Sequence, residues 1–413
     1  MERALYGPEG FFVSGAGPAA HFRTSVHASP VFAAALFRLL SQVDAALDHP
    51  ARLGVVDVGA GRGELLRALL AAAGSASGSG GGSAVGVSGE PTRSGRSGLI
   101  PARAGSPETP TTTATGRSSP APLADRVRLT AVERAPRPPD LPPEIDWVAD
   151  IPAGITGLLL ATEWLDNVPL DLAVHTPTGW HYLLVDPTTA KESLGPPVTP
   201  ADATWLSHWW PLPPTPTPSP TPSPTPPPSQ APSTPVIKKF ASPERLGSDA
   251  NFLINAVEAG VRAEIGRGRD EAWGWAVGRV ERGVALAVDY GHLRGARPVG
   301  GTLTGYRGGR QVAPVPDGSC DVTAHVAMDS VAAAGERVAG CAYSLVTQRE
   351  ALLALGADGG RPPISLAGTD PAGYVRALAT ASTVAELTDP AGLGGHWWLR
   401  QPVGIDPDAL MAR

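Results

Sequence analysis

Four short apolar runs predict the strands of a buried sheet: Leu53–Val58, Val127–Val132, Leu158–Ala161 and Val284–Val288. Runs that are apolar almost throughout are typical of strands covered on both faces. Helical patterns separate several of these runs, and a helical connection brings successive strands parallel. A helix face with i, i+4 spacing follows the first run and is formed by Leu65, Leu66, Leu69 and Leu70. The pattern therefore predicts an α/β fold with a mostly parallel central sheet.

Three further local patterns predict elements outside this sheet. Asp171–Val174 and Trp180–Val185 flank a turn sequence and predict a hairpin. Thr347 and Glu350 have the spacing of a capping box, which predicts a helix that ends near Gly356. The i, i+4 spacing of Trp205 and Trp209 predicts a helix that buries this face; we interpret the other tryptophan pairs, too, as packing or lid residues.

Two low-complexity stretches interrupt these patterns. Residues 74–122 are rich in Gly, Ser, Thr and Pro, and they have too few apolar side chains to offset the entropy lost on ordering. Residues 211–235 are rich in Pro, Thr and Ser and favour an extended polyproline segment. We expect both to be insertions in one fold, with an N-terminal helical, substrate-side segment over 1–50 and a ligand-binding domain over 51–413.

Charge and composition exclude several classes of protein. The formal net charge is −6, which argues against a nucleic-acid or anionic-membrane partner. Two cysteines allow neither a disulfide framework nor a four-cysteine zinc site, and the nine histidines show no metal-ligand spacing. The first residues lack the order of a signal peptide, and no run approaches the roughly 18 apolar residues of a membrane span. We therefore expect a cytoplasmic protein without a metal site.

The sequence DVGAGRG closes the first predicted strand and opens the first helix. Its glycines let backbone N–H groups approach a ligand, and its aspartate can hold an ammonium group. A dinucleotide site would need a small residue where Glu64 stands, so the spacing D-x-G-x-G-x-G favours the turn with which class I methyltransferases bind S-adenosyl-L-methionine. The predicted cofactor residues of this turn are Asp57, Gly59, Ala60, Gly61 and Gly63.

Two further carboxylates are candidates for the cofactor site: Glu133, after the predicted strand Val127–Val132, and Asp150, after Trp147–Ala149. Glu133 lies 76 residues after Asp57, and removal of the 49 residues of the first insertion leaves 27, an ordinary length for a βαβ unit. Glu133 is therefore expected to accept from the ribose hydroxyls, although a surface ion pair with Arg134 is an alternative. Asp150 is placed to accept from the adenine amino group, or it is a turn residue before Ile151.

A set of motifs lies in order along the chain: Gly10–Phe12, Val56–Gly63, Thr162–Pro169, Asp289–Gly291, Gly301–Leu303 with Tyr306, Asp321–Val326, and Thr347 with Gln348. The set resembles the MidA-like methyltransferases, which include a mitochondrial complex I assembly factor that methylates an arginine. The resemblance implies a Rossmann-like class I fold with additional helical and β elements on the substrate side. It also implies S-adenosyl-L-methionine as cofactor and an arginine of a protein as acceptor.

The chain departs from this family at two places. Ala20 and His21 stand where the family tends to have Gly-Asp, and Thr162 stands where it tends to have Asn. The family tends to have Asp-Ala-x-Pro where this chain has Asp166-Asn167-Val168-Pro169, so Asn167 replaces the alanine. These departures fall on the substrate side, whereas the cofactor turn is intact.

Four residues are candidates for the reaction itself. Glu163 and Asp166 follow a buried strand and are three apart, so on a helical turn they would share a face and hold a guanidinium; Asp166 is alternatively a cap. Asp289 ends another strand, where it is either catalytic or fixes a loop. His325 alternates with Asp321 and Thr323 along a predicted strand and suits proton removal, or it is a structural histidine.

We therefore predict a methyltransferase that acts on a protein, with no P-loop, H-E-x-x-H or G-x-S-x-G motif to suggest other chemistry. Two alternatives remain at this point. One is a non-catalytic adaptor whose proline-rich segment docks a partner, and the other is a nicotinamide-dependent oxidoreductase. The oligomeric state is open, and a homodimer is one of the options.

Overall fold

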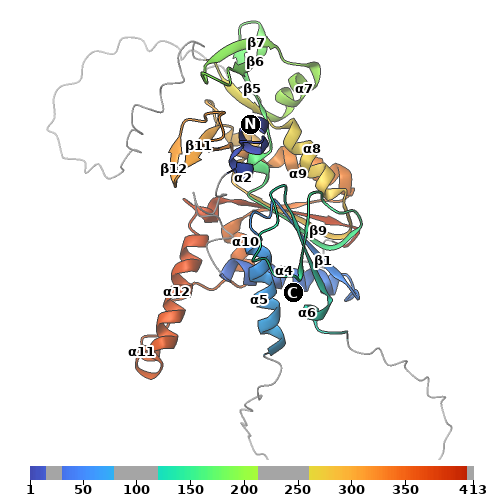
Figure 1. Cartoon of the computed structure of the whole chain (residues 1–413), viewed down its shortest axis with the longest axis vertical. Helices are drawn as coiled ribbons and strands as arrows, with labels where there is room; N and C mark the ends of the chain where they lie inside the picture. The colour runs from blue at the N-terminus through green and yellow to red at the C-terminus, as the bar shows by residue number, and fades with distance from the viewer. Residues whose placement is uncertain (15–29, 79–119, 213–259, 407–413) are drawn as a thin grey trace, which may run out of the picture.

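The computed structural model describes residues 1–14, 30–78, 120–212 and 260–406. Within these ranges the chain forms a central sheet covered by helices on both faces, with smaller sheets stacked beyond one end of it (Figure 1). Most of the two predicted insertions, as well as Ala20 and His21, lies outside the described residues. Where the first insertion is described, helix α5 continues to Gly78, past the boundary expected at residue 74.

The central sheet has the strand order β15-β16-β9-β4-β1-β2-β3. The strands are β1 Leu53–Val58, β2 Val127–Val132, β3 Ile145–Val148, β4 Ile155–Thr162, β9 Val280–Asp289, β15 Ser344–Thr347 and β16 Trp397–Val403. Strands β9, β4, β1, β2 and β3 are parallel, and β16 is antiparallel to both of its neighbours. This confirms the predicted mostly parallel sheet. The strand order reverses between β1 and β4, which is where open α/β sheets bind their ligands.

Helices on the two faces of the sheet enclose two apolar cores. The first face carries α4 Pro30–Ala46, α5 Glu64–Gly78, α10 Gln348–Ala354 and α12 Pro371–Leu387, and the second carries α8 Arg267–Val277 and α9 Met328–Ala339. Along β1, Leu53 and Val55 enter the first core, whereas Val56 and Val58 enter the second. Burial on both faces explains why the strand is apolar almost throughout.

Two smaller sheets of three or four strands lie beyond one end of the central sheet (Figure 1). The first is antiparallel, in the order β7-β6-β5-β8, and consists of β5 Asp171–Thr176, β6 Gly179–Val185, β7 Glu192–Pro197 and β8 Arg262–Ile265. The second contains β11 Thr304–Arg307, β12 Arg310–Val312 and β13 Asp321–Thr323. Strands β5 and β6 confirm the predicted hairpin.

The N-terminal segment 1–50 is divided between the two parts of the molecule. Helices α1 Glu2–Tyr6 and α2 Phe11–Ser14 pack against β13 through a small core that includes Leu5, Phe11 and Val322. Helix α4, in contrast, belongs to the core of the central sheet. The remaining elements are α6 Leu123–Arg126, α11 Ser365–Thr369, the pair β10 Gly291–His292 and β14 Val326–Ala327, and the 3-10 turns η2 Leu165–Asn167, η4 Arg294–Ala296 and η5 Leu393–Gly395.

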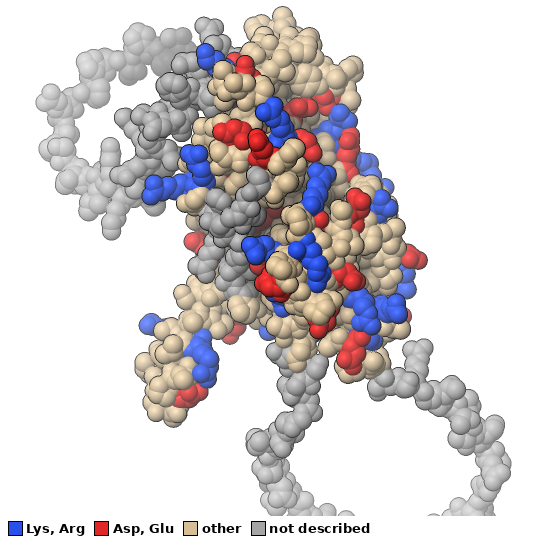
Figure 2. Space-filling model, in the orientation of Figure 1, with Lys and Arg blue, Asp and Glu red and all other residues tan. Residues whose placement is uncertain are grey.

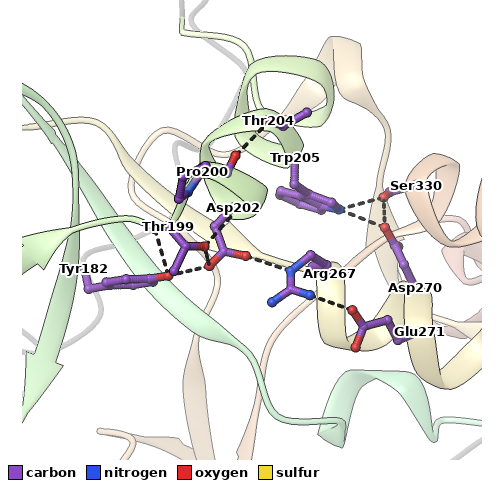
Figure 3. Close-up of polar contacts among 10 residues, drawn as sticks. All are labelled: Tyr182, Thr199, Pro200, Asp202, Thr204, Trp205, Arg267, Asp270, Glu271 and Ser330. Atoms are coloured by element: carbon purple, nitrogen blue, oxygen red, sulfur yellow. Dashed lines mark hydrogen bonds and ion pairs between the residues drawn. The ribbon is translucent and has the colours of Figure 1, made fainter.

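Helix α7, Pro200–Trp209, joins the antiparallel sheet to α8 and α9 (Figure 3). The indole N–H of Trp205 donates to Asp270 of α8 at 2.8 Å and to Ser330 of α9 at 3.1 Å. Trp205 is buried, as the helical spacing predicted, in a core that also contains Trp210, whereas Trp209 is only half-buried and packs at the edge of this core. The predicted capping box is confirmed, since Thr347 and Glu350 bond each other's backbone at the start of α10.

No helix among the described residues is long and apolar enough to cross a bilayer.

Candidate active site

A pocket of about 670 Å³ lies at the carboxyl ends of β1, β2 and β4. Its floor and walls come from the loops after these strands, and residues of α1, α2 and α8 complete it. Tyr6 ties the two sides together, because its hydroxyl donates to the carbonyl of Asn167 at 3.4 Å while the guanidinium of Arg134 lies 5.1 Å from its ring centre. The pocket is therefore at the position where sheets of this kind bind ligands.

The glycine turn after β1 forms one wall of this pocket. Gly59, Gly61 and Gly63 all have positive φ, at 72°, 58° and 80°. A Cβ on Gly59 would lie 2.9 Å from the ring of Trp164, so protein packing alone requires that glycine. A Cβ on Gly61 would meet only the Glu64 carboxylate, at 3.5 Å. The open space beside Gly61 thus belongs to the pocket, and it admits a ligand that lies against the backbone.

Three carboxylates at strand ends line the pocket together with Gly59, Ala60 and Gly61: Asp57 near the end of β1, Glu133 after β2 and Asp150 after β3. Glu133 is oriented by three N–H groups, those of Gly61 at 3.1 Å, Arg134 at 2.7 Å and Ala135 at 3.2 Å. Glu133 thus lies beside the turn and is anchored by backbone N–H groups, whereas the side chain of Arg134 pairs with Glu2 at 3.4 Å. Gly63 lies under the turn, where a Cβ would meet Leu141 at 2.6 Å.

Asp57 is the most deeply buried of these carboxylates. Its side chain is 4% exposed, and burial, with the nearby Glu64 and Glu133, raises its pKa to about 8. A carboxyl in such an environment would be stabilised as the ion by a ligand cation. The turn, Asp57 and Glu133 together fit a ligand that has an ammonium group and hydroxyls.

A second wall is formed by residues of Thr162–Pro169, at the end of β4 and in the loop that follows it. Glu163 has a left-handed backbone with φ of 50°, and the 3-10 turn η2 begins only at Leu165. The helical turn expected to carry both Glu163 and Asp166 therefore excludes Glu163. Both residues nevertheless line the pocket, because the bend at Glu163 and the turn that follows fold this loop back over it.

Asp166 is 3% exposed and its two oxygens have different environments. Oδ2 accepts from the hydroxyl of Tyr290 and from Thr323 Oγ1, the latter at 2.6 Å. Oδ1 is buried and has no hydrogen-bond partner within the described ranges, and the same holds for Oγ1 of Thr162, which also lines the pocket. Burial raises the pKa of Asp166, against the effect of the two hydroxyls and of Arg269.

Asp289 and His325 do not line the pocket. Asp289 is fully buried, and its carboxylate accepts from the N–H groups of Leu165 at 3.0 Å and Asp166 at 3.2 Å. This is the arrangement of the alternative, loop-fixing role. His325 is exposed, and it follows β13 instead of lying in it, because that strand ends at Thr323. The predicted alternation along a strand is therefore wrong at His325.

Several residues that matter to the pocket were not predicted as site residues. Trp164 and Tyr290 belong to the motifs that carry the family resemblance, and this membership could have marked them as site residues. Tyr6 and Arg269 carry no local signal, because their contacts with the loop after β4 join positions 161 and 103 residues apart. Among the described residues, no cluster of three or more His, Cys, Asp or Glu could hold a metal ion.

Comparisons with known proteins agree on one class. The sequence pattern of a family described as "Putative S-adenosyl-L-methionine-dependent methyltransferase" matches residues 117–347, more than half of the chain. No curated protein matches.

Two solved structures from Burkholderia thailandensis have the same fold. One, described as a "likely methyl transferase" bound to S-adenosyl-homocysteine, is 20% identical with a TM-score of 0.64, over 100% of this chain and 89% of the other. The second, a native structure described as an uncharacterized member of the same superfamily, is 20% identical with a TM-score of 0.61. That alignment covers 99% of this chain and 87% of the other. The shared fold is a class I methyltransferase-like α/β fold.

Proposed function

The chain belongs to this family of S-adenosyl-L-methionine-dependent methyltransferases, and from that premise we propose that it methylates a guanidinium nitrogen of an arginine residue in a protein. The cofactor of the family is S-adenosyl-L-methionine. The family assignment leaves the nicotinamide-dependent alternative without support. The observation that carries the arginine proposal is Oδ1 of Asp166, which is buried in the pocket wall after β4 and has no hydrogen-bond partner within the described ranges.

The residues of the turn fit the cofactor. Asp57 would hold its amino group, Glu133 its ribose hydroxyls and Asp150 its adenine amino group, while Gly61 leaves the space that the ligand needs. When bound, S-adenosyl-L-methionine supplies a methyl group activated by a positively charged sulfur. In the neighbour from Burkholderia thailandensis the bound molecule is S-adenosyl-homocysteine, which has the same groups apart from the methyl.

The acceptor side fits a guanidinium. Glu163 and Asp166 present carboxylates to the pocket from two separate parts of one loop, and carboxylates bind arginine through charge-assisted hydrogen bonds. Because the pKa of arginine exceeds 12, a neutral nitrogen is scarce and must be produced at the site. Asp166 Oδ1 is the atom to which that proton would move, and burial favours its protonated form.

Substitution of Glu163 tests the acceptor site. We expect Glu163→Gln to lower kcat/KM by about ten- to a hundredfold, because one charge-assisted hydrogen bond to the acceptor contributes roughly 1.5–3 kcal/mol. Affinity for S-adenosyl-homocysteine should stay within about twofold. The matched control is Glu271→Gln, since Glu271 is exposed and pairs with Arg267 outside the pocket. Equal kcat/KM in the Glu163 and Glu271 variants would contradict the acceptor role of Glu163, whereas a cellular role that Glu163→Gln retains would favour the adaptor alternative.

The chemical identity of the acceptor is tested directly. The enzyme is incubated with methyl-labelled S-adenosyl-L-methionine and a heat-treated protein extract, and the labelled proteins are hydrolysed to amino acids. We expect the label in methylated arginine and none with a Gly61→Val blank. Label in another amino acid would overturn the arginine proposal while leaving the methyltransferase assignment in place.

The raised pKa of Asp57 predicts pH-dependent cofactor binding. Below about pH 8 the ligand-free protein holds this carboxyl protonated, so the cofactor's ammonium must displace the proton. Affinity for S-adenosyl-homocysteine should therefore rise toward pH 8, by roughly tenfold per unit at lower pH. Calorimetry in two buffers of different ionisation enthalpy should show about one proton released at pH 7.

The same shift affects stability without ligand. Because folding raises the pKa of Asp57 from 3.8 to about 8, its contribution to stability is present in acid and is lost as pH rises through that window. Asp57→Asn should abolish both effects. An affinity that does not change with pH would contradict the assignment of Asp57 to the amino group.

We also propose that neither nucleic acid nor a membrane is a partner of this protein. On the face shown in Figure 2, acidic and basic side chains are interspersed, whereas phosphate-rich partners need a basic stripe. A cytoplasmic location is proposed on the scarcity of cysteine.

A further inference from the structure

We propose that Tyr290 and Thr323 are positioning residues of the methyl-transfer site: their hydroxyls hold Asp166 through Oδ2, so that Oδ1 alone is left for the acceptor. The inference rests on the proposed function, because it assigns the acceptor contact to Asp166. It adds two residues from elements other than the loop that carries Asp166, and neither of them lines the pocket.

Three elements far apart in the sequence meet at this carboxylate. Asp166 lies in η2, Tyr290 follows the last residue of β9, and Thr323 ends β13. Thr323 Oγ1 lies 2.6 Å from Oδ2 of Asp166 and 2.5 Å from the Tyr290 hydroxyl, which itself donates to the same Oδ2. Both donors thus converge on one oxygen, and the carboxyl group cannot rotate without breaking both bonds.

Tyr290 is itself held firmly. Its backbone N–H donates to Asp289 at 3.0 Å, and its ring contacts the rings of His325 and His396, with centroid distances of 5.2 and 5.5 Å. Asp289 also accepts from the backbone N–H of Asp166. The end of β9 therefore fixes both the backbone and the side chain of Asp166.

The same combination of residues occurs a second time in this chain, where the start of α7 meets β6 of the antiparallel sheet (Figure 3). There Oδ2 of Asp202 accepts from the hydroxyl of Tyr182 and from Thr199 Oγ1 at 2.7 Å. The other oxygen, Oδ1, accepts from Nε of Arg267 at 2.8 Å. Two hydroxyls on Oδ2 and a guanidinium on Oδ1 complete that carboxylate.

At Asp166 the two hydroxyls are present and the guanidinium is not: Oδ1 is buried beside the pocket with no hydrogen-bond partner within the described ranges. Leaving a buried carboxylate oxygen unbonded is costly, and a ligand N–H donor removes the cost. The geometry thus assigns Oδ1 to the donor that arrives with the acceptor, and assigns Tyr290 and Thr323 to keeping Oδ1 turned toward it.

The electrostatic surroundings of Asp166 come from several elements: Tyr6 of α1, Arg269 of α8, Asp289 and Tyr290 at the end of β9, Tyr306 of β11, Asp321 of β13, and His325 before β14. The two hydroxyls lower the pKa of Asp166, and burial raises it. Loss of one hydroxyl removes a bond to the ionised form, so the pKa must rise.

The test compares Tyr290→Phe and Thr323→Val with Tyr182→Phe, which removes the equivalent hydroxyl from Asp202. The first readout is the carbon-13 resonance of the Asp166 carboxyl, assigned with Asp166→Asn and titrated by NMR in the full chain. We expect its midpoint to rise by about one pH unit in Tyr290→Phe and in Thr323→Val, and to stay unchanged in Tyr182→Phe. No movement in either of the first two variants would overturn the proposal.

The second readout is the pH profile of methyl transfer to heat-treated extract. The acid limb of kcat/KM should move upward by the same amount in the Tyr290 variant, with affinity for S-adenosyl-homocysteine unchanged. A resonance that moves without a change in the acid limb would overturn the link to the acceptor. If the wild-type enzyme places no label in arginine, the proposal of an arginine acceptor fails. The positioning role is then tested with whichever amino acid carries the label. A shift of both the Asp166 resonance and the acid limb for that acceptor would still support the positioning role.

Discussion

Gly61→Val is expected to abolish cofactor binding, with affinity for S-adenosyl-homocysteine lowered at least a hundredfold. Gly61 has φ of 58°, a region that β-branched residues avoid, and forcing one there costs about 1–3 kcal/mol. The isopropyl group would also enter the open space beside the turn, which the ligand needs. The N–H of Gly61 orients Glu133 as well, so a displaced turn moves the carboxylate predicted to hold the ribose.

Gly308→Val is the matched control for this experiment. Gly308 lies between β11 and β12, outside the pocket lining, with φ of 57° and open space where a Cβ would lie. Both variants therefore have nearly the same backbone strain and should lose similar stability, by roughly 1–3 kcal/mol in thermal unfolding. Calorimetry of the two variants, under conditions in which the same fraction of each is folded, then separates the effect of backbone strain from the effect of blocking the ligand. Binding by Gly61→Val within severalfold of the wild type would contradict the assignment of the turn.

The cofactor half of the site could be predicted from the sequence because its signals are local. The turn residues Asp57 to Gly63 are contiguous with a strand on one side and a helix on the other. Glu133 was found by the length of a βαβ unit once the low-complexity stretch was set aside. In a parallel sheet the carboxyl ends of neighbouring strands meet at one edge, so strand order alone brings Asp57 and Glu133 to the same pocket.

The acceptor half could be predicted only in part, because its geometry depends on contacts between distant elements. The spacing of Glu163 and Asp166 predicted a shared helical face, but the N–H of Glu163 donates to Val288 of β9, and the helical turn begins after it. The role of Asp289 depends on which backbone N–H groups reach it, and those belong to residues more than 120 positions away. Residue spacing contains no information about such contacts.

Arg269 is the residue on which this acceptor loop depends most, although nothing in its sequence context marks it. The side chain is 1% exposed, and its guanidinium donates to backbone carbonyls of two loops. On the loop after β4 it reaches Val168 at 3.1 Å and Asp166 at 2.6 Å, and on the loop after β13 it reaches Ala324 and His325 at 3.0 and 2.9 Å. These bonds join the backbone of Asp166 to the segment that follows Thr323. Its positive charge also offsets the buried carboxylates, since it lowers the pKa of both Asp166 and Asp289.

Arg269→Met should therefore lower both stability and methyl transfer. Methionine fills much of the volume but leaves several buried carbonyls without donors, for an expected loss of about 3–5 kcal/mol, or roughly 10 °C in the unfolding temperature. Arg376→Met, in α12, is the control: the Arg376 side chain is 73% exposed and its partner Asp370 is 53% exposed, so this ion pair should contribute about 1 kcal/mol or less. The carboxylates near Arg269 would lose their cationic neighbour, so residual activity should require higher pH. Similar unfolding temperatures for the two variants would show that the bonds of Arg269 to the backbone do not hold the acceptor loop.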